Sequence, residues 1–404
     1  MSGSINASER FVAVHCDRTF LSLWGMANPV GKDGTKELCD YLVVCDPDII
    51  ILSVKDVHLA YEPNRITAER WHRKAIEASV KQIYGAERFL TGVSSVHDHS
   101  GRTLLLPPAD RRQIHRLCVA FGSHGRVGLR MGDFGKGFIH VMDEVSFPIL
   151  LRHLDTICDL THYLGAKRTF IEAGRRAICP GEEHLLALYL SNSRSFPNGH
   201  DLIVVDNTLW PGFTGSEENR RRQGADRASY AWDKIIEYIS KDLLADDLLY
   251  VQPSSEAERV LRVLARENRF YRRFLGENLT EVLLGGNVRA RMVQSLSGVV
   301  YVFMAVERTM DFQHRIAELT ARCLVARSRH PNAGTVVGIA SERADDGEKG
   351  LSFGLCLIDK PEWTVEDEKE ANWLSENLGY FWSPIISTRH VEEYPIGTMN
   401  RDSS

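Results

Sequence analysis

The chain has 404 residues, 43% of them hydrophobic and 25% charged, which is typical of a globular protein and excludes a disordered or fibrous one. Its 49 basic and 54 acidic residues give a net charge of −5, so nucleic-acid binding through bulk positive charge is excluded, and such binding needs a local basic patch or a partner. The length favours two or three domains. The absence of a long apolar run predicts no membrane span and no membrane partner, and the polar first nine residues predict no secretory signal.

The first part of the chain alternates helix and strand signals. A helix is predicted over residues 8–23 and a turn over 28–34. Two strands follow over 38–45 and 49–54, joined by the hairpin Asp46-Pro47-Asp48, then a helix over 67–90 whose apolar residues recur every three or four positions. Strands over 114–121 and 138–141 flank a glycine-rich stretch, and a helix is predicted over 147–170.

The rest of the chain changes character twice. Residues 175–280 are mostly helical, with helices predicted over 182–190, 228–244 and 257–275, a strand over 202–205 and a charged loop over 216–227. The capping box formed by Ser255 and Glu258 marks the start of the third helix. The tail is mixed, with strands over 299–306, 335–340 and 351–358, helices over 312–327 and 364–378, and an irregular end over 389–404.

The eight cysteines show no metal-site or disulfide pattern. None forms a C-x-x-C pair, and several lie within apolar runs. Buried free thiols explain this arrangement better than a disulfide framework or a zinc site, so we expect a protein of the reducing cytoplasm.

The residues with the clearest chemistry lie around the predicted hairpin. Because strand side chains alternate, Ser53 and Lys55 face the same side, and strand pairing can bring Asp40 near Lys55. A carboxylate can hold Mg²⁺ while a lysine neutralises charge on a phosphate, which is what phosphodiester hydrolysis needs. The apolar residues that flank the pair predict that it is sheltered, whereas a surface ion pair would have no functional meaning.

Two further residues are candidates for this site. Glu37 lies three positions before Asp40, so it can join the site only if it precedes the strand on a turn. Gln82 interrupts the apolar stripe of the helix over 67–90, and a buried amide needs hydrogen-bond partners. It is either a satisfied polar core residue or part of the site.

This order of elements, a helix, a strand with Asp40, a hairpin, a strand ending in x-Lys55 and another helix, resembles the PD-(D/E)XK nuclease superfamily over residues 8–120. The resemblance implies that Asp40 binds metal and that Lys55 is catalytic. The position two residues before the lysine, which binds metal in the superfamily, is Ser53 here, and acidic ligands migrate in this superfamily, so Glu37 could replace the missing carboxylate. Some branches also carry a Gln directed at the metal site or at the substrate phosphate, which Gln82 would match.

The sequence therefore predicts an α/β (α+β) protein with three parts. These are a restriction-endonuclease-like domain over residues 1–175, a mostly helical middle over 176–285 and an α+β domain over 286–404. We expect a Mg²⁺- or Mn²⁺-dependent endonuclease that hydrolyses phosphodiester bonds in DNA, with Lys55, Asp40, Glu37 and Gln82 as site residues and Asp40 and Glu37 as metal ligands. The middle and the tail would bind substrate, receive a regulatory protein or form a homo-oligomer, and the superfamily's habits suggest bacterial defence against foreign DNA.

Two alternatives stay open at this point. The Ser53 departure is compatible with a catalytically degenerate core that binds nucleic acid or a partner protein. An enzyme with its chemistry in the tail, around Arg315, Glu318 and Arg322 on one helical face, is the other, although salt bridges explain these three residues equally well.

Overall fold

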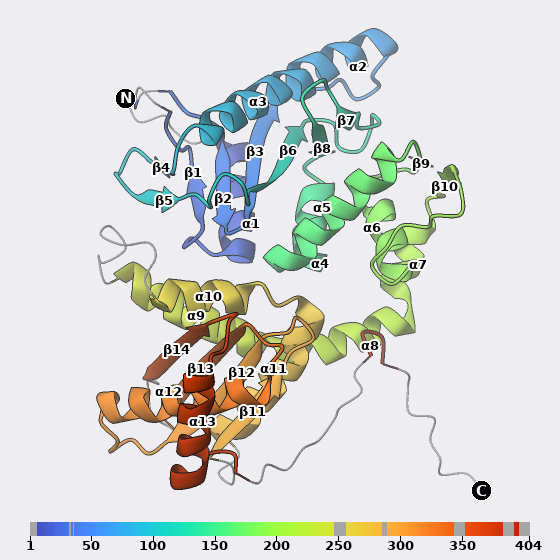
Figure 1. Cartoon of the computed structure of the whole chain (residues 1–404). Helices are drawn as coiled ribbons and strands as arrows, with labels where there is room; N and C mark the ends of the chain where they lie inside the picture. Colours follow the sequence, from blue (N-terminus) through green and yellow to red (C-terminus); the bar gives the residue numbers. More distant parts are fainter. Residues whose placement is uncertain are drawn as a thin grey trace, which may run out of the picture. The chain divides into compact units, whose positions relative to one another are not determined.

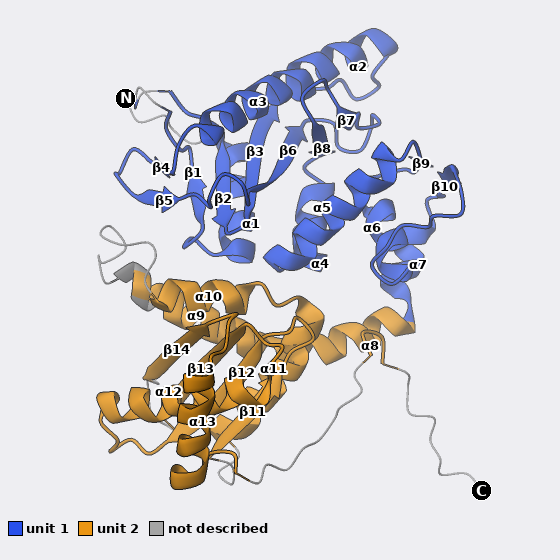
Figure 2. Ribbon diagram, in the orientation of Figure 1, with its two compact units in different colours: residues 1–216 blue, residues 217–404 orange. Residues whose placement is uncertain are grey.

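The structure, a computed structural model, describes residues 6–31, 34, 36–245, 256–284, 289–342, 352–382 and 392–395. The chain divides into two compact units, residues 1–216 and 217–404 (Figure 2). Both units are mixed α+β structures built on a mixed β-sheet. Residues 176–285, predicted as a separate helical region, contribute elements to both units.

The first unit is built on a six-stranded sheet with the order β1-β2-β3-β6-β8-β7 (Figure 1). Its strands are β1 (Gly25–Ala27), β2 (Tyr41–Cys45), β3 (Asp48–Asp56), β6 (Gln113–Phe121), β7 (Gly132–Asp133) and β8 (Phe138–Met142). Strand β6 runs parallel to β3 and β8, and the other pairs are antiparallel. The predicted hairpin is therefore present as β2–β3, with β2 starting at Tyr41 instead of residue 38.

The helices of this unit follow the predictions except that α7 was not predicted and one predicted helix is two. They are α1 (Ala7–Phe20), α2 (Arg65–Trp71), the π-helical turn η1 (His72–Glu77), α3 (Ala78–Thr91), α4 (Ser146–His153), α5 (Ile157–Glu172), α6 (Glu182–Ser191) and α7 (Leu209–Gly215). The single helix predicted over 147–170 is wrong. Thr156 has an extended backbone and its side chain accepts a hydrogen bond from the backbone N–H of Asp159, so it starts a new helix, α5.

The continuous helix α2–η1–α3 covers one face of the sheet (Figure 1). Its apolar residues pack against alternate residues of β3, such as Ile49 and Ile51. Trp71 lies in this core, where its indole N–H donates to the carbonyl oxygens of Val57, just beyond the end of β3, and Phe121, the last residue of β6. Ser53 and Lys55 belong to the same alternating set as Ile49 and Ile51, so they face α3.

Two small ribbons complete the first unit. Strands β4 (Ser95–His97) and β5 (Thr103–Leu105) form an antiparallel pair, and β9 (Arg176–Ile178) pairs in parallel with β10 (Leu202–Val204). Only β10 was predicted from the sequence. All four strands have three residues each, too few for an alternating pattern, and only β10 lies in an apolar β-branched run.

The second unit has a four-stranded sheet with the order β11-β12-β13-β14. Its elements are α8 (Glu217–Asp226), η2 (Arg227–Ser229), α9 (Tyr230–Ala245), α10 (Glu256–Ala265), α11 (Arg269–Leu284), β11 (Ala290–Gln294), β12 (Val300–Val306), α12 (Phe312–Arg329), β13 (Thr335–Glu342), β14 (Phe353–Asp359) and α13 (Val365–Leu378). Strands β12 and β13 are parallel and connected through α12, and the two edge strands are antiparallel to their neighbours.

Two sequence predictions for this unit are wrong. The charged loop predicted over 216–227 contains helix α8, where Arg221 pairs with Glu217 one turn earlier and Asn219 is buried. The helix predicted over 257–275 is broken after Ala265, and the side chain of Arg272 donates to the carbonyl oxygen of Ala265 at 2.6 Å. Ser255, predicted as a cap, and most of residues 389–404 lie outside the described residues.

Helices cover both faces of the second sheet. On one face α12 lies so close to β13 that a Cβ at Gly338 would be 2.6 Å from Sγ of Cys323. On the other face Trp232 of α9 makes edge-on contacts with Tyr301 and Phe303 of β12. Strand β12 is buried along its whole length and carries no charged residue.

All eight cysteines are free thiols, as predicted, and only Cys179 among them is not fully buried. Within the described ranges no helix combines the length and the apolar character that crossing a membrane requires.

Candidate functional site

Asp40 immediately precedes β2 and closes the end of the β2–β3 ladder. Its backbone N–H donates to Leu52, so its side chain lies opposite Ser53 on the face that α3 covers. Oδ2 of Asp40 accepts the backbone N–H of Val54 at 2.5 Å. The carboxylate therefore replaces a backbone acceptor at a strand end, and it is almost fully buried. This gives Asp40 a structural role independent of any chemistry.

Lys55 extends from β3 toward the same point and meets three oxygens. Its Nζ lies 3.5 Å from Oδ2 of Asp40, 3.0 Å from the carbonyl oxygen of Val54 and 2.7 Å from Oε1 of Gln82. The Lys55 side chain is 31% exposed and the Asp40 side chain 6%. Only the carboxylate is thus sheltered as predicted, and the Lys55 side chain is partly exposed.

Gln82 of α3 links the other members of the site. Its Oε1 accepts from Ser53 Oγ at 2.8 Å as well as from Lys55, and its Nε2 donates to Oδ1 of Asp40 at 3.3 Å. Each polar atom of this amide thus has a partner, as a half-buried amide requires. Gln82 is thus a polar residue with its hydrogen bonds satisfied, and it also contacts the predicted site residues Asp40 and Lys55.

The structure thus joins Asp40, Ser53, Lys55 and Gln82 in one hydrogen-bonded cluster, which we call the Lys55 cluster. Ser53 is fully buried and gives its hydroxyl hydrogen to Gln82. At the position where the superfamily carries a carboxylate, this chain therefore has a neutral hydroxyl paired with a neutral amide.

Glu37 lies beside the Lys55 cluster without a hydrogen bond to it among the described residues. Glu37 precedes β2, which is the position that the sequence analysis required for it to join the site. It forms an isolated β-bridge with Val30. Its side chain is half-buried. It is close enough for its charge to act on Glu9, which also feels the charges of Asp40 and Lys55.

Glu9 is the acidic neighbour that the sequence reasoning missed. It belongs to the first turn of α1, where Ser8 donates a hydrogen bond to Asp56 at the end of β3. The pKa of Glu9 is raised above its usual value, first by burial and then by the negative charges of Asp40 and Glu37. The sequence did show an acidic residue in the first turn of a predicted helix. Such a residue is common at helix starts, so it did not indicate a site.

In the part of the chain that the structure describes, no three His, Cys, Asp or Glu side chains converge closely enough to hold a metal ion. The oxygens that do converge belong to one carboxylate, one amide and one backbone carbonyl, all around Nζ of Lys55. These are hard oxygen donors, the type that Mg²⁺ and Ca²⁺ accept.

The residues singled out in the tail take part in ion pairs of the second unit. Arg315 is buried and pairs with Glu342 at 2.9 Å. Glu318 accepts from Arg322 at 2.7 Å, and the Arg322 guanidinium lies over the ring of Tyr380. These contacts are those of structural ion pairs, so they add nothing to the hypothesis of a catalytic tail.

No family model, no curated protein and no solved structure matches this chain.

Proposed function

We propose that the first unit is a restriction-endonuclease-like core and that the protein hydrolyses phosphodiester bonds of nucleic acid, with DNA as the expected substrate, in a divalent-metal-dependent reaction at the Lys55 cluster. The observation that carries this proposal is the set of three oxygens around Nζ of Lys55, whose side chain is partly exposed. A buried carboxylate and a partly exposed lysine from adjacent strands are the pair that such chemistry requires.

The proposal places a magnesium or manganese ion at Asp40. Mg²⁺ in phosphoryl-transfer sites is commonly held by one or two carboxylates together with substrate phosphate oxygens and waters, so a complete protein cage is not needed. Asp40 would be the principal ligand, with Glu37 and Glu9 as carboxylates whose charges reach the same region. Such an ion, when bound, polarises the phosphate and acidifies a bound water.

The chain's own residues have separate tasks in this proposal. Lys55 would hold its ammonium against a non-bridging phosphate oxygen and stabilise the negative charge that develops there. Gln82 positions Lys55 by accepting from its Nζ, and Ser53 in turn fixes the amide of Gln82. Asp40 ties the end of β3 to β2, which keeps Lys55 at a defined distance from the carboxylate.

A cleavage assay on the full chain tests the proposal. Supercoiled and linear duplex DNA, single-stranded DNA and RNA would be incubated with Mg²⁺, with Mn²⁺ or with EDTA. We expect metal-dependent cleavage that falls by at least about 10²-fold in Lys55→Met and Asp40→Asn, the loss typical of removing one charge-stabilising group.

The matched control is Arg111→Met. Arg111 pairs with Asp46 at 3.0 Å, near the hairpin turn at the opposite end of β2 and β3, so this substitution also removes a cation from an acid pair. Its cleavage rate should equal that of the unsubstituted protein. Cleavage that persists in EDTA, or that is equal in Lys55→Met and Arg111→Met, would rule the proposal out.

A second function is favoured by one observation, the neutral Ser53–Gln82 pair at the position of the superfamily's second carboxylate. A core without this carboxylate could bind nucleic acid or a partner protein without cleaving. In that case the unsubstituted chain binds but does not cleave, and binding is the same in EDTA and in Lys55→Met. Cleavage that appears only in Ser53→Asp would identify the degenerate core.

A further inference from the structure

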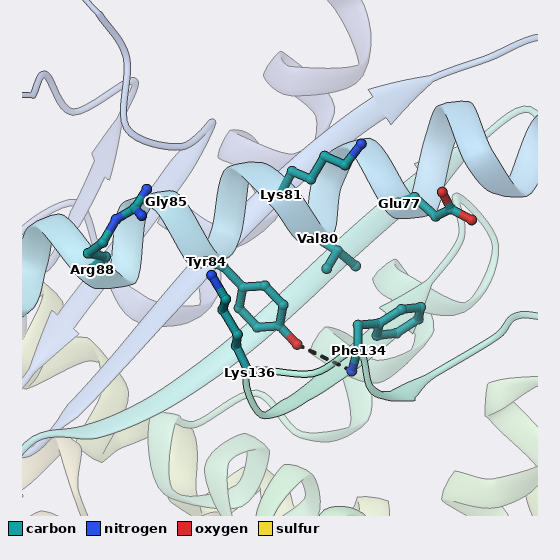
Figure 3. A pocket seen from close by; sticks show the side chains of 8 residues that line it. All are labelled: Glu77, Val80, Lys81, Tyr84, Gly85, Arg88, Phe134 and Lys136. Carbon is teal, nitrogen blue, oxygen red and sulfur yellow. Dashed lines mark hydrogen bonds between the residues drawn. The ribbon is translucent and has the colours of Figure 1, made fainter.

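A charged groove lies on the first unit between α3 and the turn that joins β7 to β8 (Figure 3). Its volume is about 470 Å³. The residues that line it are Glu77, Val80, Lys81, Tyr84, Gly85, Arg88, Phe134 and Lys136. Gln82 faces away from this groove, because it points to the Lys55 cluster on the other side of α3. The groove is therefore separate from the site described above.

Three cations of the groove carry no ion pair within the described residues. Lys81 and Arg88 are seven residues apart and share one face of α3, while Lys136 approaches from the β7–β8 turn (Figure 3). Nearby arginines do have ion-pair partners. Arg116 pairs with Glu87, and Arg130 pairs with Glu69. In a chain of net charge −5, the groove is a local surplus of positive charge, which an anionic ligand would neutralise.

The groove also presents an aromatic ring held in place. Phe134 is 38% exposed and lines the groove. The hydroxyl of Tyr84 donates to the carbonyl oxygen of Gly137 at 2.6 Å and accepts the backbone N–H of Phe134 at 3.3 Å, so the turn is fastened to α3. Asp133 accepts two further backbone N–H groups inside the turn. The ring is thus held on a braced turn and lines the same groove as the cations.

We infer that this groove binds one strand of nucleic acid, with a base stacked on Phe134 and phosphates held by Lys81, Arg88 and Lys136. An exposed ring beside unpaired cations is the combination that single-strand binding uses, because every unpaired base has a face to stack and every linkage has a phosphate. The bases of a duplex are already stacked on one another. The inference rests on the proposed function only for the kind of polymer, and it adds a second contact with that polymer.

Glu77 limits the groove at one end. It is an exposed carboxylate among the lining residues, and a phosphate placed against it would be repelled. Removing this charge should therefore tighten binding, an effect that misfolding cannot produce.

The test is fluorescence anisotropy of the full chain with labelled oligothymidylate, in EDTA so that no cleavage intervenes. The variant Lys81→Ala/Arg88→Ala/Lys136→Ala should bind at least about 10-fold more weakly. The slope of its log affinity against log salt concentration should be shallower by about 2, because each phosphate contact on a single strand contributes about 0.7 to that slope. Phe134→Ala should lose about 5- to 100-fold, the range for one stacked base. Glu77→Gln should gain affinity.

The control, Arg152→Ala/Lys234→Ala/Lys369→Ala, removes the same charge from exposed positions outside the groove. If it weakens binding as much as the groove variant does, or if polyglutamate competes as well as oligothymidylate, the inference is wrong. Affinity unchanged in Phe134→Ala would also overturn it. The two proposals fail separately, because oligonucleotide binding in EDTA reports on the groove and metal-dependent cleavage reports on the Lys55 cluster.

Discussion

Two lysine–carboxylate pairs of the first unit occupy opposite extremes of environment. Lys55 lies 3.5 Å from Asp40 with its side chain 31% exposed. Lys167 of α5 pairs with Glu182 of α6, and both side chains are at most 1% exposed. Tyr163 donates a further hydrogen bond to Glu182 at 2.7 Å. The lysine side chain is thus partly exposed in one region and enclosed in the other, while the carboxylate is buried in both.

Under the proposed function, this difference separates a pair that takes part in chemistry from one that stabilises the fold. Removing one partner from an enclosed pair leaves an uncompensated charge, which costs about 3–5 kcal/mol, whereas an exposed pair contributes about 0–1 kcal/mol to stability. The Lys55 side chain is partly exposed, whereas that of Lys167 is enclosed. The comparison predicts large stability effects at the enclosed pair and large activity effects at the partly exposed one.

The largest effect on stability is expected from Glu182→Ala. This change leaves Lys167 charged and without its partner in the interior, and it should lower the free energy of unfolding by about 3–5 kcal/mol. Urea denaturation followed by tryptophan fluorescence measures it. The double variant Lys167→Met/Glu182→Leu removes both charges and should recover most of the loss. If the double variant is as unstable as Glu182→Ala, packing and not charge explains the effect.

The next effect is expected at Lys55, where activity should change more than stability. Lys55→Met should lower metal-dependent cleavage by at least about 10²-fold while the free energy of unfolding falls by less than the about 3–5 kcal/mol expected for an enclosed pair. Parallel cleavage and urea measurements on one preparation give both values. A loss of stability as large as that of Glu182→Ala would make Lys55 a structural residue and remove the contrast between the two pairs.

A smaller effect separates the structural task of Asp40 from its proposed chemical one. Asp40→Ala removes the acceptor of the buried Val54 N–H, which should cost about 1–3 kcal/mol of stability. Asp40→Asn keeps an oxygen acceptor and should retain most of that stability while cleavage is lost. Equal unfolding free energies for the two variants would show that the hydrogen bond to Val54 contributes little.

The smallest effect concerns pH and lies close to the enclosed pair. The pKa of His140 on β8 is lowered well below its usual value, first by burial and then by the positive charge of Lys167. Below pH 6.5 the unfolded chain therefore binds a proton at this position that the folded chain does not. Stability falls as the pH is lowered, by at most about 1.4 kcal/mol per pH unit for one proton.

Unfolding free energies measured at several pH values below 6.5, in the unsubstituted protein and in His140→Asn, isolate this contribution. The dependence on pH should be shallower in the variant, because the group that titrates is gone. Identical slopes would mean that other groups account for the acid sensitivity of the unit.

Local pattern alone was enough to predict several elements. Alternation of side chains predicted the β2–β3 hairpin and the shared face of Ser53 and Lys55, and the three- and four-residue period predicted the helix through α2 and α3. The role assigned to these residues stays a prediction. Local pattern did not show that 147–170 and 257–275 each contain two helices, because the contacts that end α4 and α10 come from caps and from a side chain of the next helix.

The sequence by itself thus determined the alternating segments, the free cysteines and the position of the hairpin, since each depends on residues only a few positions apart. The tertiary structure alone decided that Gln82 meets Asp40 from 42 positions away, that Glu9 lies near them and that Lys167 is enclosed with Glu182. The exposed fractions of the Lys55 and Lys167 side chains were likewise decided by the tertiary structure, because they depend on which helices cover each lysine. The exposed fraction distinguishes Lys55 from Lys167, whose ammonium groups are chemically identical.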